Sequence, residues 1–457
     1  MKVIQSFWSQ GQADILPCSF GWMAPQYNWL SWILSANQLA KYYAVELYTD
    51  QKGYEILIEK LQLPYAKVHV VLDELNHYHK DLWAIPKIKA YSLQQAPFLH
   101  VDGDVFIWEP FPEKLMQAGL ITQNLESTTL YYKNMWDEIK PKLQYIPTEM
   151  DKYVYGINNS ACNMGIIGGH DIDFFQTYTT TAFEFVNRNK DVWHNINGFN
   201  FNIFYEQLLF HEQAMIQQRE VDFLIDGITE DNNYVGFGDF DKVPKQKTYL
   251  HLLGVYKTNR RVSKMLEAYV MKEYPQFVER LAQLYPQTYP AFASGHTFTV
   301  GQNRQLMQRL MQSIQGGEAI TIDKDFLLAR DFLALEQPQD FDDWRITEQD
   351  CMLVWLPGTR IVIIDEAQQS KSLLVGELDG SFLASEMDEV DEIIINELAK
   401  PKTYFLLMED LKGYLDEEAL EEWDTFRTMV TNRLRYFITA KALLFYLPAN
   451  QQNLNNP

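Results

Sequence analysis

The chain has 457 residues, of which 47% are hydrophobic and 22% are charged, and it carries a formal net charge of −22 at pH 7. This composition supplies a sizeable hydrophobic core and argues against intrinsic disorder. The negative charge would repel polyanions, which makes nucleic acids and anionic membrane surfaces unfavourable partners.

Strands and helices alternate along the first hundred residues, a pattern typical of βαβ units on a mostly parallel sheet. A fourth strand starts at Phe98 and runs into Asp102-Gly103-Asp104. Ligands bind at the carboxyl ends of the strands in such sheets, so these two carboxylates are placed where a ligand is expected. The expected strands before it cover 3–8, 45–49 and 67–72, and the expected helices cover 27–43, 53–61 and 81–93.

The pattern continues with longer helices up to about residue 284. Residues 126–155 are rich in aromatic side chains and give no clear periodicity. The sequence predicts strands at 120–123, within 158–169, at 221–225 and at 247–253, and helices at 174–187, 204–218 and 263–284, the last one broken by Pro275.

The composition shifts near 285–302, where Pro, Gly, Ser, Thr and Asn become frequent, as at a domain border. We therefore expect a first domain over 1–290, a linker with a helix over 291–317, an α+β accessory domain of unknown role over 318–448 and a disordered tail over 449–457. Within the accessory domain the sequence predicts strands at 319–322, 352–355, 360–364, 373–375 and 403–407, followed by an acidic helical stretch around 409–445.

Three features predict a cytoplasmic chain. The three cysteines are widely spaced and odd in number, which favours a reducing compartment. The N-terminus has no signal-peptide pattern. No stretch reaches the roughly 18 consecutive apolar residues that a membrane span needs.

Asp102 and Asp104 are the first candidate site. Burying an unpaired carboxylate costs several kcal/mol, so each needs a partner. The simplest shared partner is a hard divalent cation that also binds substrate phosphates. An isolated Asp-X-Asp is more often an acidic turn at a strand end, so this motif needs support from elsewhere in the chain.

The second candidate stretch runs from His251 to Lys257. His251 offers a neutral nitrogen to a borderline metal such as Mn²⁺. Gly254 permits close approach of a phosphate to the backbone, and Lys257 supplies a positive charge. A lone histidine at a strand end is usually structural, but together the two stretches contain what a metal-bridged diphosphate requires.

Taken together, these stretches resemble GT-A-fold glycosyltransferases, and within them the retaining family that includes glycogenin and bacterial lipopolysaccharide galactosyltransferases. Asp-X-Asp and His-X-X-Gly-X-X-Lys in this order are more specific than either motif alone. The resemblance rests on Lys87, Asp102-Gly103-Asp104, Trp108-Glu109-Pro110-Phe111, Cys162-Asn163-Met164-Gly165-Ile166-Ile167 and His251-X-X-Gly254-X-X-Lys257. It implies an α/β, GT-A-like mixed sheet flanked by helices, which forms a nucleotide-sugar-binding domain over 1–290, followed by the smaller α+β domain.

The resemblance also implies roles for individual residues. Asp102, Asp104 and His251 would bind Mn²⁺ or Mg²⁺. On the donor, Lys87, Asp102, Gly254 and Lys257 would contact the nucleotide sugar, and Asn163 would lie near the transferred sugar. The family's acidic-Gln pair corresponds to Glu212-Gln213, although Glu206-Gln207 fits almost as well. The family usually continues with Pro-Trp after the lysine, whereas Thr258-Asn259 follow here.

The leading hypothesis is a metal-dependent, retaining hexosyltransferase that takes a UDP-sugar as donor and a glycan, lipid or peptide as acceptor, and that could form a homo-oligomer. The alternative is a binding or scaffold protein on a GT-A fold without catalysis, because fold does not imply function. A metal phosphoesterase would need more His and Asp ligands for a two-metal site than the sequence offers.

Overall fold

The computed structural model describes residues 1–127, 130–154, 160–229, 234–288, 352–355, 359–366, 369–378, 381–439 and 442–446. The chain divides into two compact units. One comprises Met1–Asp239, Gln246–Val270 and Gln276–His296, and the other comprises Phe240–Lys245, Met271–Pro275 and Thr297–Pro457.

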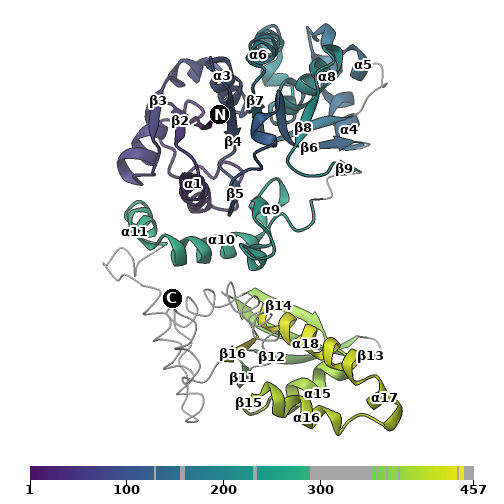
Figure 1. The fold of residues 1–457 in the computed structure, drawn as a ribbon. Helices are drawn as coiled ribbons and strands as arrows, with labels where there is room; N and C mark the ends of the chain where they lie inside the picture. Colours follow the sequence, from purple (N-terminus) through teal and green to yellow (C-terminus); the bar gives the residue numbers. More distant parts are fainter. Residues whose placement is uncertain are drawn as a thin grey trace. The chain divides into compact units, whose positions relative to one another are not determined.

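An eight-stranded mixed sheet forms the centre of the first unit (Figure 1). Its strand order is β3-β2-β1-β4-β7-β6-β8, and β9 pairs with β6. Neighbouring strands from β3 to β4 are parallel, β7 is antiparallel to both of its neighbours, and β8 and β9 are parallel to β6. The strands are β1 Lys2–Phe7, β2 Val45–Thr49, β3 Lys67–Val70, β4 Phe98–Val101, β6 Leu120–Ser127, β7 Ala161–Gly169, β8 Val221–Phe223 and β9 Ile228–Thr229.

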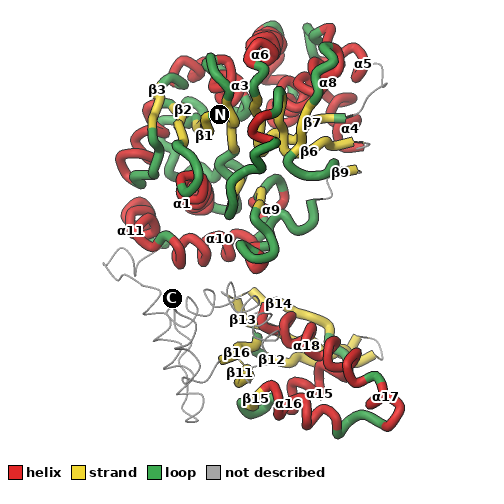
Figure 2. Tube along the Cα trace, viewed as in Figure 1, coloured by secondary structure: helices red, strands yellow, loops and turns green. Residues whose placement is uncertain are grey.

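Helices flank this sheet (Figure 2). The longest early helix, α1, begins at Pro25, whose fixed φ suits the first helical position. The predicted break of the last helix at Pro275 is confirmed, since α11 begins there. The helices are α1 Pro25–Ala40, α2 Gln51–Tyr54, α3 Ile85–Ser92, α4 Leu130–Ile139, α5 Asp151–Val154, α6 Ile172–Asn187, α7 Gly198–Ile203, α8 Leu209–Ile216, α9 Val255–Thr258, α10 Arg260–Glu273 and α11 Pro275–Leu284.

The central strand β4 is buried on both faces, as its unbroken apolar run predicts. Neighbouring residues of the strand enter different hydrophobic clusters. Phe98 packs in the cluster that contains Phe175 of α6, and Leu99 packs in the cluster that contains Leu39 of α1. Both faces of the sheet are therefore covered, which leaves the carboxyl end of β4 as the place where polar side chains gather.

The apolar residues after Asp104 do not extend β4. They form a separate strand, β5 Val105–Ile107, which pairs antiparallel with β10 Tyr249–His251 in a two-stranded sheet. His251 lies opposite Val105 in this pairing. The change of sheet at Asp102-Gly103-Asp104 thereby brings the two candidate motifs next to each other.

The described part of the second unit is an α+β arrangement. Strand β11 Met352–Trp355 pairs with β15 Lys402–Thr403 and β16 Leu443–Tyr446, and β12 Arg360–Glu366, β13 Gln369–Leu378 and β14 Ser381–Glu386 form a second sheet. The helices are α15 Glu389–Glu397, α16 Tyr404–Lys412, α17 Glu417–Glu421 and α18 Trp423–Thr439.

Two local predictions for this unit are wrong. Residues from Tyr404 onward are helical rather than extended, because the hydroxyl of Thr403 accepts a hydrogen bond from the backbone of Leu406 and caps α16. The end of the expected acidic helix is instead strand β16, which pairs with β11.

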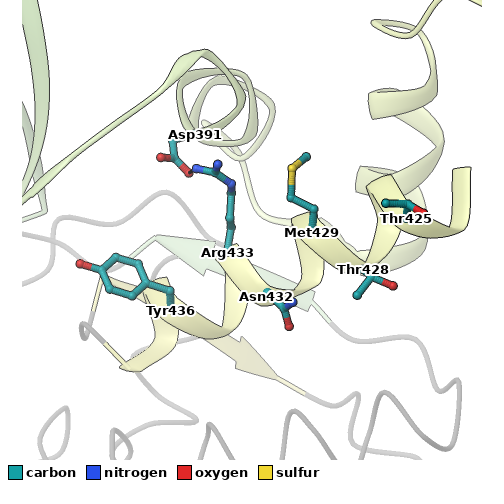
Figure 3. A pocket seen from close by; sticks show the side chains of 7 residues that line it. All are labelled: Asp391, Thr425, Thr428, Met429, Asn432, Arg433 and Tyr436. Atoms are coloured by element: carbon teal, nitrogen blue, oxygen red, sulfur yellow. Dashed lines mark ion pairs between the residues drawn. The ribbon is translucent and has the colours of Figure 1, made fainter. Parts of the chain in front are cut away.

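A surface groove of about 570 Å³ runs along α18 (Figure 3). Its arginine, Arg433, lies 2.6 Å from the carboxylate of Asp391 and also binds Asp388. The positive charge on this side of the groove is thus already paired within the unit.

The α/β class predicted from the sequence is confirmed: a mixed sheet flanked by helices precedes a smaller α+β unit. The domain limits at 290, 317 and 448 remain a proposal. The expected linker and helix over 291–317, the strand at 319–322 and the tail over 449–457 lie outside the described residues. Among the described helices, none combines the length and apolar character needed to cross a membrane.

Candidate metal and donor site

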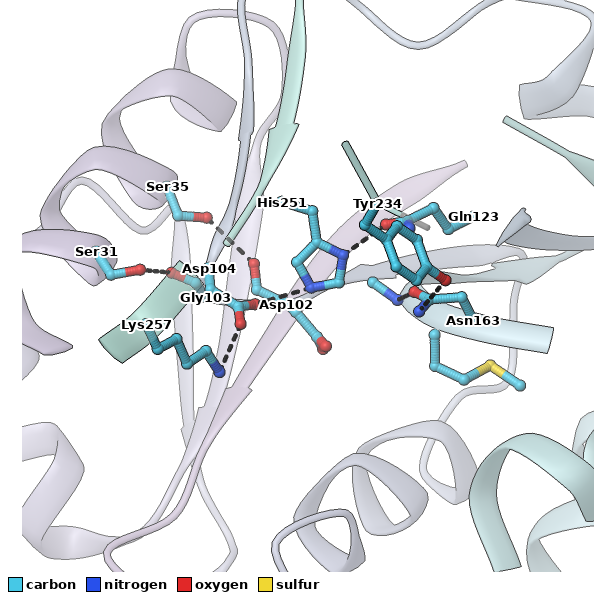
Figure 4. A network of polar contacts seen from close by, with 12 residues as sticks. Ser31, Ser35, Asp102, Gly103, Asp104, Gln123, Asn163, Tyr234, His251 and Lys257 are labelled. Atoms are coloured by element: carbon cyan, nitrogen blue, oxygen red, sulfur yellow. Dashed lines mark hydrogen bonds and ion pairs between the residues drawn. The ribbon is translucent and has the colours of Figure 1, made fainter. Parts of the chain in front are cut away.

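The turn between β4 and β5 holds the two candidate carboxylates in place (Figure 4). The hydroxyl of Ser31 on α1 donates a 2.7 Å hydrogen bond to the carbonyl oxygen of Gly103. A Cβ at Gly103 would lie 2.6 Å from the Trp32 ring, so only glycine allows α1 to pack this closely against the turn. This packing fixes the direction of Asp102 and Asp104.

His251 approaches the same point from β10. Its Nε2 lies 3.5 Å from Oδ1 of Asp104. Asp102, Asp104 and His251 each offer a ligand atom, and these atoms all lie within 4.8 Å of one another. Two carboxylate oxygens and one imidazole nitrogen fit a divalent cation such as Mn²⁺. The structure therefore contains an Asp-Asp-His group that could hold a metal ion.

Both carboxylates also have a lysine partner within the protein, which the sequence motif alone did not reveal. Lys257 lies 2.7 Å from Asp104, and Lys87 lies 3.0 Å from Asp102. Burial alone would raise the pKa of Asp104, but the charge of Lys257 lowers it well below its usual range. Burial raises the pKa of Asp102 despite the opposing charge of Lys87, and the neighbouring Asp104 adds to the increase.

Lys87 is shared with a further carboxylate, Glu206, which lies 2.6 Å from its ammonium group. Glu206 is completely buried in a π-helical turn, a local distortion that is frequent at functional sites. Burial raises the pKa of Glu206 to about 7, more than the charge of Lys87 lowers it. Burial would lower the pKa of Lys87, but Asp102 and Glu206 together raise it.

The acidic-Gln pair expected first from the sequence lies one helix further on. Glu212 and Gln213 are both buried on α8, and one carboxylate oxygen of Glu212 lies 3.2 Å from Nδ1 of His211. Of the two glutamates that the sequence left open, Glu206 is the one whose carboxylate contacts Lys87 and thereby the Asp102 side of the site. The catalytic roles of Glu212 and Gln213 remain a prediction.

Asn163 lies on β7, near the Asp-Asp-His group (Figure 4). Its amide nitrogen donates to Oε1 of Glu126 at 3.0 Å and to the hydroxyl of Tyr234 at 2.9 Å. Its carbonyl oxygen accepts from the backbone of Gly165 at 3.0 Å. Burial raises the pKa of Glu126, although Tyr234 and Asn163 stabilise its charged form. A buried amide with all three contacts satisfied is held rigidly in one orientation.

Gly254 directly precedes α9 and has a φ of +50°, a backbone conformation that favours glycine. A Cβ at this position would meet no atom within 4 Å. The space in front of this backbone is therefore open. Lys257 follows on the same short helix, with its ammonium 5.9 Å from the centre of the Trp22 ring. Gly254 and Lys257 thus lie on one side of the Asp-Asp-His group.

Several residues of the site were not identified from the sequence. Gln123, Glu126 and Tyr234 form hydrogen bonds in or next to the group, and all three are buried. Gln123 ends one of the predicted strands, so its polar side chain at that position was a usable signal. Glu126 lies in the stretch 126–155 without clear periodicity, and Tyr234 lies between two predicted strands, so neither position gave such a signal.

Comparisons with known proteins give a family but no activity. The model described as "Family of unknown function (DUF6734)" matches residues 1–284. No curated protein matches the sequence. The solved apo form of mouse xyloside xylosyltransferase 1 is similar at 11% identity and a TM-score of 0.28, over 49% of this chain and 84% of that chain. This similarity is too weak to bear on the activity of the present chain.

Proposed function

The chain belongs to the family of unknown function DUF6734, and we propose that it is a metal-dependent glycosyltransferase that moves a hexose from a UDP-sugar to an acceptor. The observation that carries the proposal is the convergence of Asp102, Asp104 and His251 within 4.8 Å at the carboxyl end of β4. That position is where sheets of this kind bind ligands.

The charge balance of the site supports a bound cation with a diphosphate. The chain has a net charge of −22, and two carboxylates of the site face the same point. A free diphosphate would be repelled there. A divalent cation, Mn²⁺ rather than Mg²⁺ because of the imidazole ligand, would offset this charge and the charge that grows on the leaving diphosphate.

Two residues on the α9 side are suited to the diphosphate itself. The open space before Gly254 lets phosphate oxygens approach the backbone closely. Lys257 now neutralises Asp104 at 2.7 Å. Once a cation shares Asp104, the lysine can turn its charge toward a phosphate and stabilise the developing negative charge.

The remaining residues are placed to act on the sugar side. Lys87 is held between Asp102 and Glu206, so we assign it to orienting Asp102 and the donor. Asn163, fixed by Glu126 and Tyr234, is assigned to the transferred sugar. We favour Glu206 over Glu212 as the carboxylate of the sugar side because Glu206 reaches the site through Lys87. Retention of configuration rests on the family resemblance alone.

Calorimetry with UDP tests the proposal. We expect binding in the presence of Mn²⁺ and clear weakening after addition of EDTA, because a cation held by Asp102, Asp104 and His251 would supply the positive charge that a diphosphate needs there. His251→Ala and Lys257→Ala should each weaken binding further. His77→Ala is a matched control, since His77 is an exposed histidine outside the Asp-Asp-His group, and its Nδ1 bonds the backbone carbonyl oxygen of Glu74.

Equal binding of UDP with and without Mn²⁺ would contradict the proposal. If UDP binds with Mn²⁺ but no UDP-sugar is hydrolysed or transferred, the chain is instead a binding protein on the same fold. A donor-hydrolysis assay without acceptor separates these two outcomes.

A further inference from the structure

Gln123 lies directly behind His251, on the side away from Asp104. Its Oε1 is 2.7 Å from Nδ1 of His251 and accepts a hydrogen bond of 2.5 Å from the hydroxyl of Tyr249. Gln123 is completely buried. A Cβ at Gly165 would come within 2.3 Å of Gln123 Oε1 and 2.6 Å of His251 Nδ1, so glycine on β7 makes room for this contact.

The amide of Gln123 can take only one orientation. Its Nε2 donates to Oδ1 of Asn124 at 2.9 Å, and Nδ2 of Asn124 donates to the carbonyl oxygen of Leu125 at 3.2 Å. A carbonyl oxygen can only accept, so it determines which end of the Asn124 amide faces it. Asn124 in turn determines that Gln123 presents its nitrogen to Asn124 and its oxygen to His251.

An oxygen that faces Nδ1 requires a proton on Nδ1. In the neutral imidazole the other nitrogen then carries a lone pair, and this nitrogen, Nε2, is the one that lies 3.5 Å from Asp104. The chain of hydrogen bonds from His251 through Gln123 and Asn124 to the carbonyl oxygen of Leu125 therefore leaves Nε2 of His251 unprotonated on the Asp104 side.

We propose that Gln123 is a positioning residue that holds His251 in the Nδ1-protonated tautomer and so keeps Nε2 available to a divalent cation. This inference rests on the proposed function, because it concerns the same metal site. Partners that orient a ligating histidine in this way typically contribute about 10- to 100-fold to metal affinity.

The first test uses the metal-free wild-type protein labelled with ¹⁵N in its histidines. Spectra are recorded near pH 9, well above the pH of about 6.5 at which imidazoles ordinarily take up a second proton. The signals of His251 are identified by their loss in His251→Ala. We expect a single tautomer with the proton on Nδ1. A proton on Nε2, or an even mixture of tautomers, would overturn the inference.

The second test measures Mn²⁺ affinity by calorimetry in Gln123→Met, which keeps the length of the side chain but removes the acceptor oxygen. We expect Mn²⁺ binding to weaken about 10- to 100-fold and His251 to show both tautomers. Tyr249→Phe is the matched control: it removes the other hydrogen bond to the same oxygen but leaves the His251 contact, so its Mn²⁺ affinity should stay within about twofold of the wild type.

The outcomes separate this inference from the proposed function. If His251→Ala binds Mn²⁺ as tightly as the wild type, the metal site itself is wrong, whatever the tautomer. If His251→Ala loses affinity but a folded Gln123→Met keeps it, only the role of Gln123 is wrong. If Gln123→Met does not fold, the tautomer in the wild-type protein still decides.

Discussion

Two lysines set the charge of the site before any cation is present. Lys257 pairs with Asp104, and Lys87 pairs with both Asp102 and Glu206. Removing Lys87 or Lys257 would leave a carboxylate charge uncompensated at a largely buried site, which is strongly destabilising. Asp102 and Asp104 therefore belong to ion pairs of the fold as well as to the candidate metal site, which the isolated Asp-X-Asp motif did not indicate.

Glu206 gives the site a testable dependence on pH. Its pKa is raised from 4.5 to about 7 in the folded protein. Between these values the unfolded chain has released the proton while the folded protein retains it, so the free energy of unfolding falls as pH rises. For a fully buried group with this shift, the free energy of unfolding at neutral pH is about 3 kcal/mol lower than at acidic pH, where both states hold the proton.

We expect Glu206→Gln to remove this loss. The amide keeps the size of the side chain but has no proton to release. The difference in free energy of unfolding between the variant and the wild type should therefore shift in favour of the variant as the pH rises from about 5 to about 8. Urea unfolding of both proteins at the two pH values measures the difference. Glu138→Gln, on the exposed face of α4, is the control and should follow the wild-type profile. Parallel profiles for wild type and Glu206→Gln would mean that Glu206 is ionised throughout.

At the scale of secondary-structure elements, the contact between α1 and the β4–β5 turn positions the site. The turn must pass under the Trp32 ring, and the hydroxyls of Ser31 and Ser35 bind its carbonyl oxygens. Any side chain at Gly103 would push α1 away from the turn. The distances within the Asp-Asp-His group thus depend on how α1 packs against the turn as well as on the three side chains themselves.

The variant Gly103→Ala tests this dependence. We expect it to lower the free energy of unfolding by about 1–3 kcal/mol, because the added methyl group overpacks against Trp32. It should also weaken Mn²⁺-dependent UDP binding. Gly119→Ala is the matched control, because a Cβ there meets no atom within 4 Å, and its stability should change by less than about 1 kcal/mol. Equal stabilities of the two variants would contradict the packing argument.

At the scale of the whole molecule, all the residues assigned to the site lie between Lys87 and Lys257. The family model ends at residue 284, before the strands and helices that are described from Met352 onward. The contribution of the C-terminal half to function is therefore separable in principle from donor binding. Its proposed role as an accessory domain predicts how a chain that lacks it should behave.

We expect a protein that ends near Gln315 to fold alone and to bind UDP with Mn²⁺ as the full chain does. Thermal unfolding and calorimetry provide the measurement, with the full-length protein as control. An insoluble product, or a folded one that does not bind UDP, would mean that the two halves share a core or a site. Loss of transfer with retained UDP binding would assign acceptor recruitment to the C-terminal half.

The sequence by itself determined the local parts of this protein. The unbroken apolar run at Phe98 predicted a strand buried on both faces, and alternation of strands and helices predicted the sheet. The positions of Asp102, Asp104 and His251 at strand ends predicted a shared site, because polar side chains become accessible to a ligand where a buried strand ends. Each of these inferences depends on patterns that can be read along the chain.

Only the tertiary structure decided which elements meet. The pairing of β5 with β10 places His251 opposite Val105, and the contacts of Lys87 with Glu206 and of Gln123 with His251 join residues on different elements. Periodicity reports which face of an element is buried, but it does not report which distant side chain lies on the other side of that face. The sequence thus predicted the group of Asp102, Asp104 and His251. It did not predict that Lys87 and Lys257 pair with the two carboxylates or that Gln123 contacts His251.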